Sequence, residues 1–125
     1  MSKNFREKDF EKRHAEYLKI KEKYPERVPV IVEKSGTSDL PDLDKKKFLV
    51  PEELGFGNFK YIIQKRIKLS SEQALFVFIG KNTIPKVTET MGQLHADHKE
   101  ADGFLYLTYT GENVFGSEDW PGSEE

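Results

Sequence analysis

The apolar residues of this chain come in short runs interrupted by proline and charge, and this constrains its fold more than any other feature. The longest run, Ala74 to Gly80, is far shorter than the ~20 residues of a membrane-spanning helix. Short runs suit strands and amphipathic helices around one core, and 125 residues are enough for one such domain. We therefore expect a single small domain and no membrane span.

Cysteine is absent, which excludes a disulfide framework, a zinc ribbon and a thiol-dependent enzyme. The first six residues lack a hydrophobic signal core, and Ser2 stands where N-myristoylation requires glycine. Nine Phe and five Tyr supply core material in a chain that is 34% charged. These features predict a folded cytoplasmic protein.

The charges are distributed unevenly. Residues 1–68 hold 17 basic and 12 acidic side chains, whereas residues 69–125 hold 3 basic and 10 acidic ones. The last nine residues contribute four acids and no base, so their loss would change the net charge from −2 to +2. They are either a solvated acidic tail or a removable segment.

Helical spacing of aromatic and basic residues predicts a helix within residues 4–24, with a separate short turn at residues 5–8 and Asp9 as N-cap. Pro25 ends it, because the residue before proline is disfavoured in the α region. Two β-branched runs, residues 28–33 and 48–50, predict a hairpin with a long loop. Pro29 must then occupy an unpaired position, since proline donates no hydrogen bond.

The second half predicts two further helices and two further strands. The helices are marked by apolar spacing at residues 56–67 and 91–98, the second with Thr90 as its cap. The strands are residues 75–79 and 104–110, with a short extended piece at residues 83–85. In residues 104–110, Phe104, Tyr106 and Thr108 are expected to face one side, and Leu105, Leu107 and Tyr109 the other. This order favours an α+β fold with helices on one face of a small sheet.

Motifs for catalysis are absent, including phosphate-binding loops and nucleophile elbows. His95 and His98 could bind a metal with Asp97 or His14, but a polar helix surface explains them more simply, and no metal or cofactor is expected. The basic residues at 45–47, 65, 66 and 68 are a charged rim, a patch for nucleic acid or anionic lipid, or the border of a peptide groove.

The sequence resembles the GABARAP and microtubule-associated light-chain-three family, the ubiquitin-like modifiers of autophagy (autophagy-related protein eight family). The resemblance spans about residues 9 to 116. It is carried by Phe10-Glu11-Lys12-Arg13, Lys23-Tyr24-Pro25-Glu26-Arg27-Val28-Pro29-Val30-Ile31-Val32-Glu33-Lys34, Asp42-Leu43-Asp44-Lys45-Lys46-Lys47-Phe48-Leu49-Val50-Pro51, Phe59 with Lys65-Arg66-Ile67, Met91-Gly92-Gln93-Leu94 and Asp102-Gly103-Phe104-Leu105-Tyr106.

The resemblance implies a ubiquitin-like β-grasp domain with two additional N-terminal helices and no enzymatic activity. It divides the chain into an N-terminal helical extension (1–24), the ubiquitin-like domain (25–110), a flexible conjugation tail (111–116) and a removable propeptide (117–125). A cysteine protease would recognise Phe115, Gly116 and Ser117 and cut after Gly116. Activating and conjugating enzymes would then join Gly116 to phosphatidylethanolamine, which would move the protein from the cytoplasm to the autophagosome membrane and on to the vacuole or lysosome.

The resemblance also implies capture of receptors and adaptors that carry a short aromatic-x-x-aliphatic motif, which docks as an added strand at residues 48–50. The aromatic pocket corresponds to Glu16, Ile20, Pro29, Ile31, Lys47, Leu49 and Phe104. The aliphatic pocket corresponds to Phe48, Val50, Pro51, Leu54, Phe59, Ile62 and Ile63. The charged rim corresponds to Arg27, Lys45 and Arg66.

Two rival hypotheses remain open from the sequence. One is a ubiquitin-like adaptor of vesicle traffic or microtubules that is never lipidated. The other is a small enzyme that uses His95, His98 and Asp97.

Overall fold

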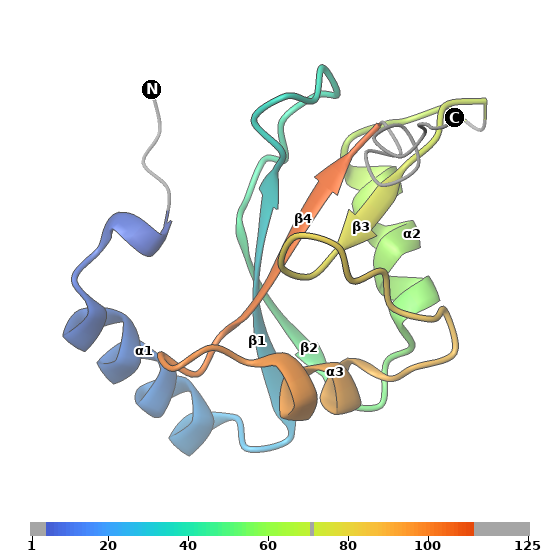
Figure 1. The fold of residues 1–125 in the computed structure, drawn as a ribbon. Coiled ribbons are helices and arrows are strands. Elements are labelled where there is room, and N and C mark those ends of the chain that lie inside the picture. The colour runs from blue at the N-terminus through green and yellow to red at the C-terminus, as the bar shows by residue number, and fades with distance from the viewer. Residues whose placement is uncertain (1–4, 71, 112–125) are drawn as a thin grey trace.

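The structure, a computed structural model, describes residues 5–70 and 72–111. Its elements lie in the order η1, α1, β1, β2, α2, β3, α3, β4 (Figure 1). Their bounds are η1 Phe5–Glu7, α1 Phe10–Lys23, β1 Arg27–Lys34, β2 Lys47–Pro51, α2 Phe56–Arg66, β3 Phe76–Phe78, α3 Met91–His98 and β4 Leu105–Thr110.

The strands form one mixed sheet in the order β2-β1-β4-β3. β1 pairs antiparallel with β2 and parallel with β4, and β3 pairs antiparallel with β4. The chain therefore returns β4 to the centre of the sheet, beside β1, and leaves β2 at one edge and β3 at the other.

The two central strands are buried on both faces of the sheet. On one face, Val30, Val32, Leu105 and Leu107 join the main core, to which α2 contributes Phe59. α2 and α3 lie on this side of the sheet in Figure 1, and α1 lies on the other. Thr90 caps α3 as expected, since its side chain accepts a hydrogen bond from the Gln93 N–H.

A second, smaller core covers the opposite face. It consists of Phe5, Ile31, Phe104 and Tyr106, with Tyr17 and Ile20 of α1 packed against it. The expectation that the helices cover one face only was wrong, because β1 and β4 present large apolar side chains on both faces. The expected alternation of side chains in residues 104–110 is confirmed.

A buried carboxylate fastens α1 to the loop before β4. The Asp102 side chain is fully buried and accepts hydrogen bonds from Arg13 Nη1 at 2.8 Å, Tyr106 Oη at 2.6 Å and the Phe104 N–H at 3.0 Å. Such a charge is stable in the interior only with these partners, so α1 is held by a specific polar contact as well as by packing.

Several boundaries differ from the sequence expectations. The N-terminal region is split into η1 and α1 with Asp9 at the N-cap, as expected, but both ends of the expected stripe, Phe10 and Tyr24, are exposed. The strand expected at residues 75–79 is confined to β3. Residues 83–85 form no strand of their own, although Thr83 makes an isolated bridge to Ile79.

Pro29 lies at a position of β1 where neither neighbouring strand needs a backbone N–H donor. The Val32 N–H donates to the carbonyl of Lys46, the residue before β2, so by alternation the Pro29 nitrogen faces the β4 side. The pairing with β4 begins one residue later, at Val30 opposite Leu105. The proline therefore removes no hydrogen bond from either ladder.

Gly103 should tolerate no side chain. Its φ is +97°, and an added Cβ would lie 2.3 Å from the Tyr17 ring. Gly103→Ala should lower the free energy of unfolding by at least about 2 kcal/mol, because it combines backbone strain with a steric clash. Urea unfolding measures this, with Gly36→Ala as the matched control, since nothing lies within 4 Å of that position. Equal stability of both variants would contradict this close contact of α1.

His95 should make stability depend on pH. Its ring is buried, its Nε2 lies 2.7 Å from the Gly103 carbonyl oxygen, and burial lowers its pKa, with Lys21 and Lys99 adding to this effect. The ordinary pKa of histidine is about 6.5. As the pH falls below this value, His95 binds a proton more readily in the unfolded chain than in the folded one, so the stability that neutral His95 contributes is lost.

Unfolding at pH 7.5 and pH 5.5 tests this expectation. His95→Gln, which keeps a donor for Gly103, should lose less stability between the two pH values than the unchanged chain, whereas His98→Gln should behave like the unchanged chain. An identical loss in His95→Gln would refute the role of His95.

Candidate functional site

Strand β2 has a free edge. Among the described residues it pairs only with β1, and the hydrogen bond from the Val32 N–H to the Lys46 carbonyl fixes which of its residues face β1. By alternation, the backbone groups of Lys47 and Leu49 point away from the sheet. Such groups can pair with an added strand.

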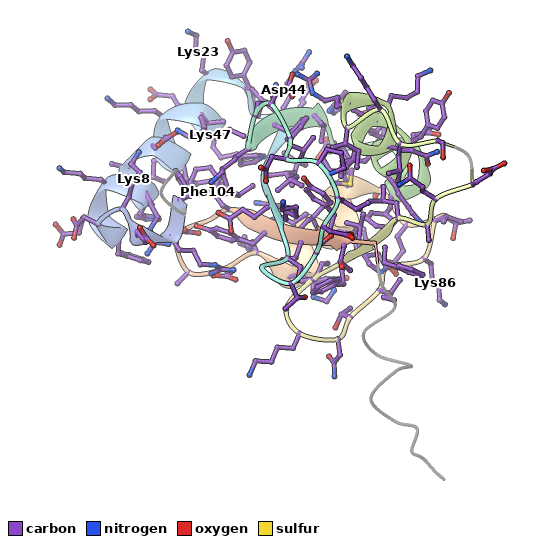
Figure 2. The ribbon with its side chains drawn as sticks, turned by 90° about the horizontal axis from the view of Figure 1, so that it is seen from above. Lys8, Lys23, Asp44, Lys47, Lys86 and Phe104 are labelled. Carbon is purple, nitrogen blue, oxygen red and sulfur yellow. The ribbon has the colours of Figure 1, made fainter. Side chains whose placement is uncertain are left out.

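The predicted aromatic pocket lies between this edge and α1. Pro29, Ile31 and Phe104 form its buried floor, while Ile20 and Leu49 are partly buried at its sides. In Figure 2, Lys8, Lys47 and Phe104 lie along the border between α1 and the sheet. The structure thus brings the predicted residues together from α1, β1, β2 and the residue just before β4.

Phe5 covers part of this floor, and the sequence prediction missed it. Its ring is 5.1 Å from the Phe104 ring in an edge-to-face contact, and its backbone N–H donates to Glu33 Oε2 at 3.2 Å. An isolated apolar residue in a polar N-terminal segment was the available signal. A ligand side chain that reaches Ile31 must therefore displace Phe5 or enter beside it.

An ion pair bridges the two walls of the aromatic pocket. Lys47 Nζ of β2 lies 2.9 Å from Glu16 Oε2 of α1, and Lys8 Nζ lies 3.2 Å from Glu16 Oε1. Burial alone would raise the pKa of Glu16, but the hydrogen bonds from both lysines outweigh it and hold the pKa below its ordinary value. The pair is half exposed, so it costs little to open.

The predicted aliphatic pocket lies on the other side of β2, between this strand and α2. Phe48 packs edge-to-face on Phe59 with ring centroids 5.4 Å apart. Phe59 and Ile63 have no exposed surface and form the floor. The accessible rim consists of the partly buried Leu54 and Ile62 and the exposed Pro51. On this side, a ligand can therefore reach the rim residues without a rearrangement but not the floor.

The three predicted rim residues all lie near β2. Arg66 holds Asp44 with two hydrogen bonds, of 3.0 and 2.9 Å, and lowers the pKa of that carboxyl group. Lys45 Nζ lies 4.7 Å above the Phe48 ring. The Arg27 guanidinium lies 3.5 Å from the Leu49 carbonyl oxygen at the free edge. The groove border is basic.

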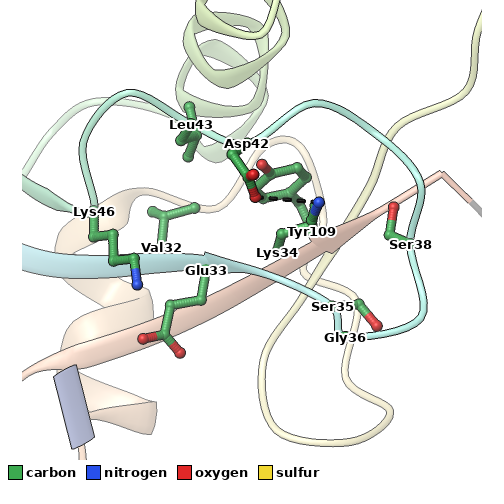
Figure 3. A pocket seen from close by; sticks show the side chains of 10 residues that line it. All are labelled: Val32, Glu33, Lys34, Ser35, Gly36, Ser38, Asp42, Leu43, Lys46 and Tyr109. Atoms are coloured by element: carbon green, nitrogen blue, oxygen red, sulfur yellow. Dashed lines mark ion pairs between the residues drawn. The ribbon is translucent and has the colours of Figure 1, made fainter. Parts of the chain in front are cut away.

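A separate hollow of about 390 Å³ lies under the loop that joins β1 to β2 (Figure 3). An ion pair of 3.1 Å between Lys34 and Asp42 crosses it, and the Tyr109 hydroxyl donates to the Pro41 carbonyl at 2.7 Å. None of the predicted groove residues lines it. Lys34 and Asp42 are paired with each other and Glu33 accepts the Phe5 N–H, and we assign the hollow no ligand.

The predicted cleavage and conjugation residues, Phe115, Gly116 and Ser117, lie outside the described residues. The described chain ends just beyond β4, where the Gly111 N–H lies 3.3 Å from Ser38 Oγ and donates to it. β4 thus delivers the C-terminal segment to the end of the sheet that the β1–β2 loop covers.

The residues of the enzyme hypothesis do not converge. His95 Nε2 bonds to the Gly103 carbonyl oxygen, and Asp97 accepts a hydrogen bond from Gln93. Residues 5–70 and 72–111 contain no group of three side chains placed to hold a metal, and no helix in them could span a membrane.

Comparison with known proteins agrees with this geometry. A family model described as "Autophagy protein Atg8 ubiquitin like" matches residues 12–116. The crystal structure of Trypanosoma brucei ATG8 superposes with a TM-score of 0.80 at 39% identity, covering 90% of this chain and 96% of that one. The fold is therefore a ubiquitin-like α+β fold, as the sequence predicted.

Plant relatives are closely similar over most of the chain. Autophagy-related protein 8a of Arabidopsis thaliana is 57% identical over 107 residues, which are 86% of this chain and 87% of the relative. Autophagy-related protein 8A of Oryza sativa subsp. indica is 53% identical over 111 residues, 89% and 92% of the two chains. The narrower assignment to the GABARAP and light-chain-three branch stays a prediction. The chain belongs to the Atg8 family of ubiquitin-like autophagy proteins.

Proposed function

We propose that this chain is a conjugated modifier, cut after Gly116 by a cysteine protease and joined by activating and conjugating enzymes to phosphatidylethanolamine. The family match ends at Gly116, directly after an aromatic residue. The five residues beyond Gly111 reach roughly 17 Å when extended, enough to enter an enzyme cleft. Glycine has no Cβ, which leaves its carbonyl open to attack.

Conjugation would anchor a domain that has no membrane span of its own among its described residues. Phosphatidylethanolamine brings two acyl chains, each CH₂ of which contributes about 0.8 kcal/mol when buried. The protein would move from the cytoplasm to the autophagosome membrane, and with its cargo to the vacuole or lysosome. The chain itself would act as a handle rather than as an enzyme.

On that membrane, the groove along β2 would capture receptors and adaptors with aromatic-x-x-aliphatic motifs. The observation that carries this proposal is the free edge of β2 between two apolar clusters, with a basic border. An added strand would bond to Lys47 and Leu49 and place alternate side chains in the two pockets. Two anchors of about 1.5–3 kcal/mol each, less the ordering of a peptide, suggest an affinity of order micromolar.

A non-lipidated adaptor with the same groove is the second candidate. It needs only the free edge of β2, whereas the modifier also needs the Phe115-Gly116 pair. The intact mass of the protein in cytosolic and membrane fractions separates the two candidates.

Groove variants should weaken peptide binding. Leu49→Ala should reduce the affinity of a labelled aromatic-x-x-aliphatic peptide about tenfold, because it removes one wall of the aromatic pocket. Lys47→Glu should weaken a peptide with acidic flanks further by charge repulsion. Matched controls are Val87→Ala and Lys86→Glu, since both residues are exposed and outside the groove, and Lys86 lies far from Lys47 in Figure 2. Equal affinities for Leu49→Ala and Val87→Ala would remove the groove assignment.

Gly116→Ala should block cleavage and lipid attachment while leaving the fold unchanged. Mass spectrometry of cells should then find the chain at full length, without loss of residues 117–125 and without an added phospholipid. Peptide affinity measured on the same variant serves as the control for folding. A lipidated Gly116→Ala chain would contradict the assigned site.

A further inference from the structure

The acidic C-terminal segment contains the sequence Glu118-Asp119-Trp120, and Trp120 is the chain's one tryptophan. Two acids followed by an aromatic residue match the first half of the ligand that the groove is proposed to take. The position three residues after Trp120 is Ser123, so the second, aliphatic anchor is missing. The segment therefore has the chemistry of an incomplete ligand.

We propose that Trp120 occupies the aromatic pocket of its own chain before cleavage, so that the uncut protein holds its groove partly closed. This inference rests on the proposed function of the groove. It commits to residues 118–120 of the same chain as the occupant.

Charge complementarity favours this occupant. Within the described part of the chain, Arg27 and Lys45 form no ion pair, and both lie beside β2. Lys45 lies close enough to Asp44 to lower the pKa of that carboxyl group, and the acids before Trp120 would add direct partners for both cations. The last nine residues contain no basic side chain that could oppose them.

The chain is long enough to reach the pocket. Leu49 opposes Pro29 of β1, and Ile31 lies beside Tyr106, four residues before the end of β4. At ~3.3 Å per residue along the strands and ~4.8 Å between them, the pocket lies roughly 22 Å from Thr110. The ten residues from Thr110 to Trp120 span roughly 33 Å when extended, which leaves slack for a path over the surface.

The contact should be weak by itself, because Phe5 covers the floor of the pocket and the indole must displace Phe5 or enter beside it. Beside Phe5, Ile20 and Leu49 are only partly buried, and the half-exposed ion pair of Lys47 with Glu16 links β2 to α1 there. One anchor without its aliphatic partner would bind in the millimolar range, but a short tether supplies an effective concentration that is also about millimolar. The uncut chain should therefore bind outside peptides roughly two- to tenfold more weakly than a chain with a free pocket.

Cleavage after Gly116 would then have two consequences. It would create the carboxylate for conjugation and release residues 118–120 from the tether in the same step. Receptor binding would be favoured only on molecules that are ready for attachment to the membrane.

Full-length variants test the proposal with a labelled aromatic-x-x-aliphatic peptide. Trp120→Ala should raise peptide affinity roughly two- to tenfold, and Ser123→Ala, the matched control, should leave it unchanged. Ser123→Leu completes the ligand within the tail and should lower the affinity for the added peptide at least tenfold, since a second anchor is gained. The emission of Trp120 should shift to longer wavelength in Leu49→Ala, because the indole loses its apolar site.

The outcomes separate this inference from the proposed function. If the peptide binds the unchanged chain, Trp120→Ala and Ser123→Leu equally, the tail does not occupy the groove and the inference is wrong. If the peptide binds none of them, the groove itself is wrong and the inference falls with it. If the differences vanish when the protein is diluted tenfold, the occupant is the tail of a second copy, which overturns the intramolecular contact.

Discussion

The structure depends on the burial of β1 and β4 on both faces. A small sheet with helices on one side can leave its other side polar, but here Ile31, Phe104 and Tyr106 make the second face apolar. That face requires a cover, which α1 and Phe5 supply. The N-terminal region is therefore part of the packing of this domain, although its helix has no fully buried residue of its own.

The way α1 is attached decides where a groove can form. Its firm contacts are the buried ion pair of Arg13 with Asp102 and the packing of Tyr17 on Gly103, both in the loop before β4. Toward β2 it is joined by the more exposed pair of Glu16 with Lys47. A helix held tightly on one side and loosely on the other leaves an apolar seam beside the free edge, which is where an added strand needs its anchor.

The sequence alone predicted the features that depend on local physics. Period-two alternation gave the two faces of β4, the cap of α3 followed from Thr90, and Pro25 lies just beyond α1. The alternation of side chains along a strand does not show which other strand it pairs with. The parallel pairing of β1 with β4 could therefore not be predicted from it. The candidate groove residues came from resemblance to a family. Phe5 was missed because its burial depends on contacts about 100 residues away in the chain, at Phe104 and Tyr106.

The free edge of β2 also carries a risk of aggregation, which the sequence of this strand reduces. An exposed edge with apolar neighbours can pair with any other strand, and proteins suppress this with lysine, proline and short length. β2 is five residues long, begins with Lys47, ends at Pro51 and follows two further lysines. In the proposed function, the same lysines that discourage pairing between copies would favour peptides with acidic residues. Protection against aggregation and the proposed selection of ligands would thus be two results of one charge pattern.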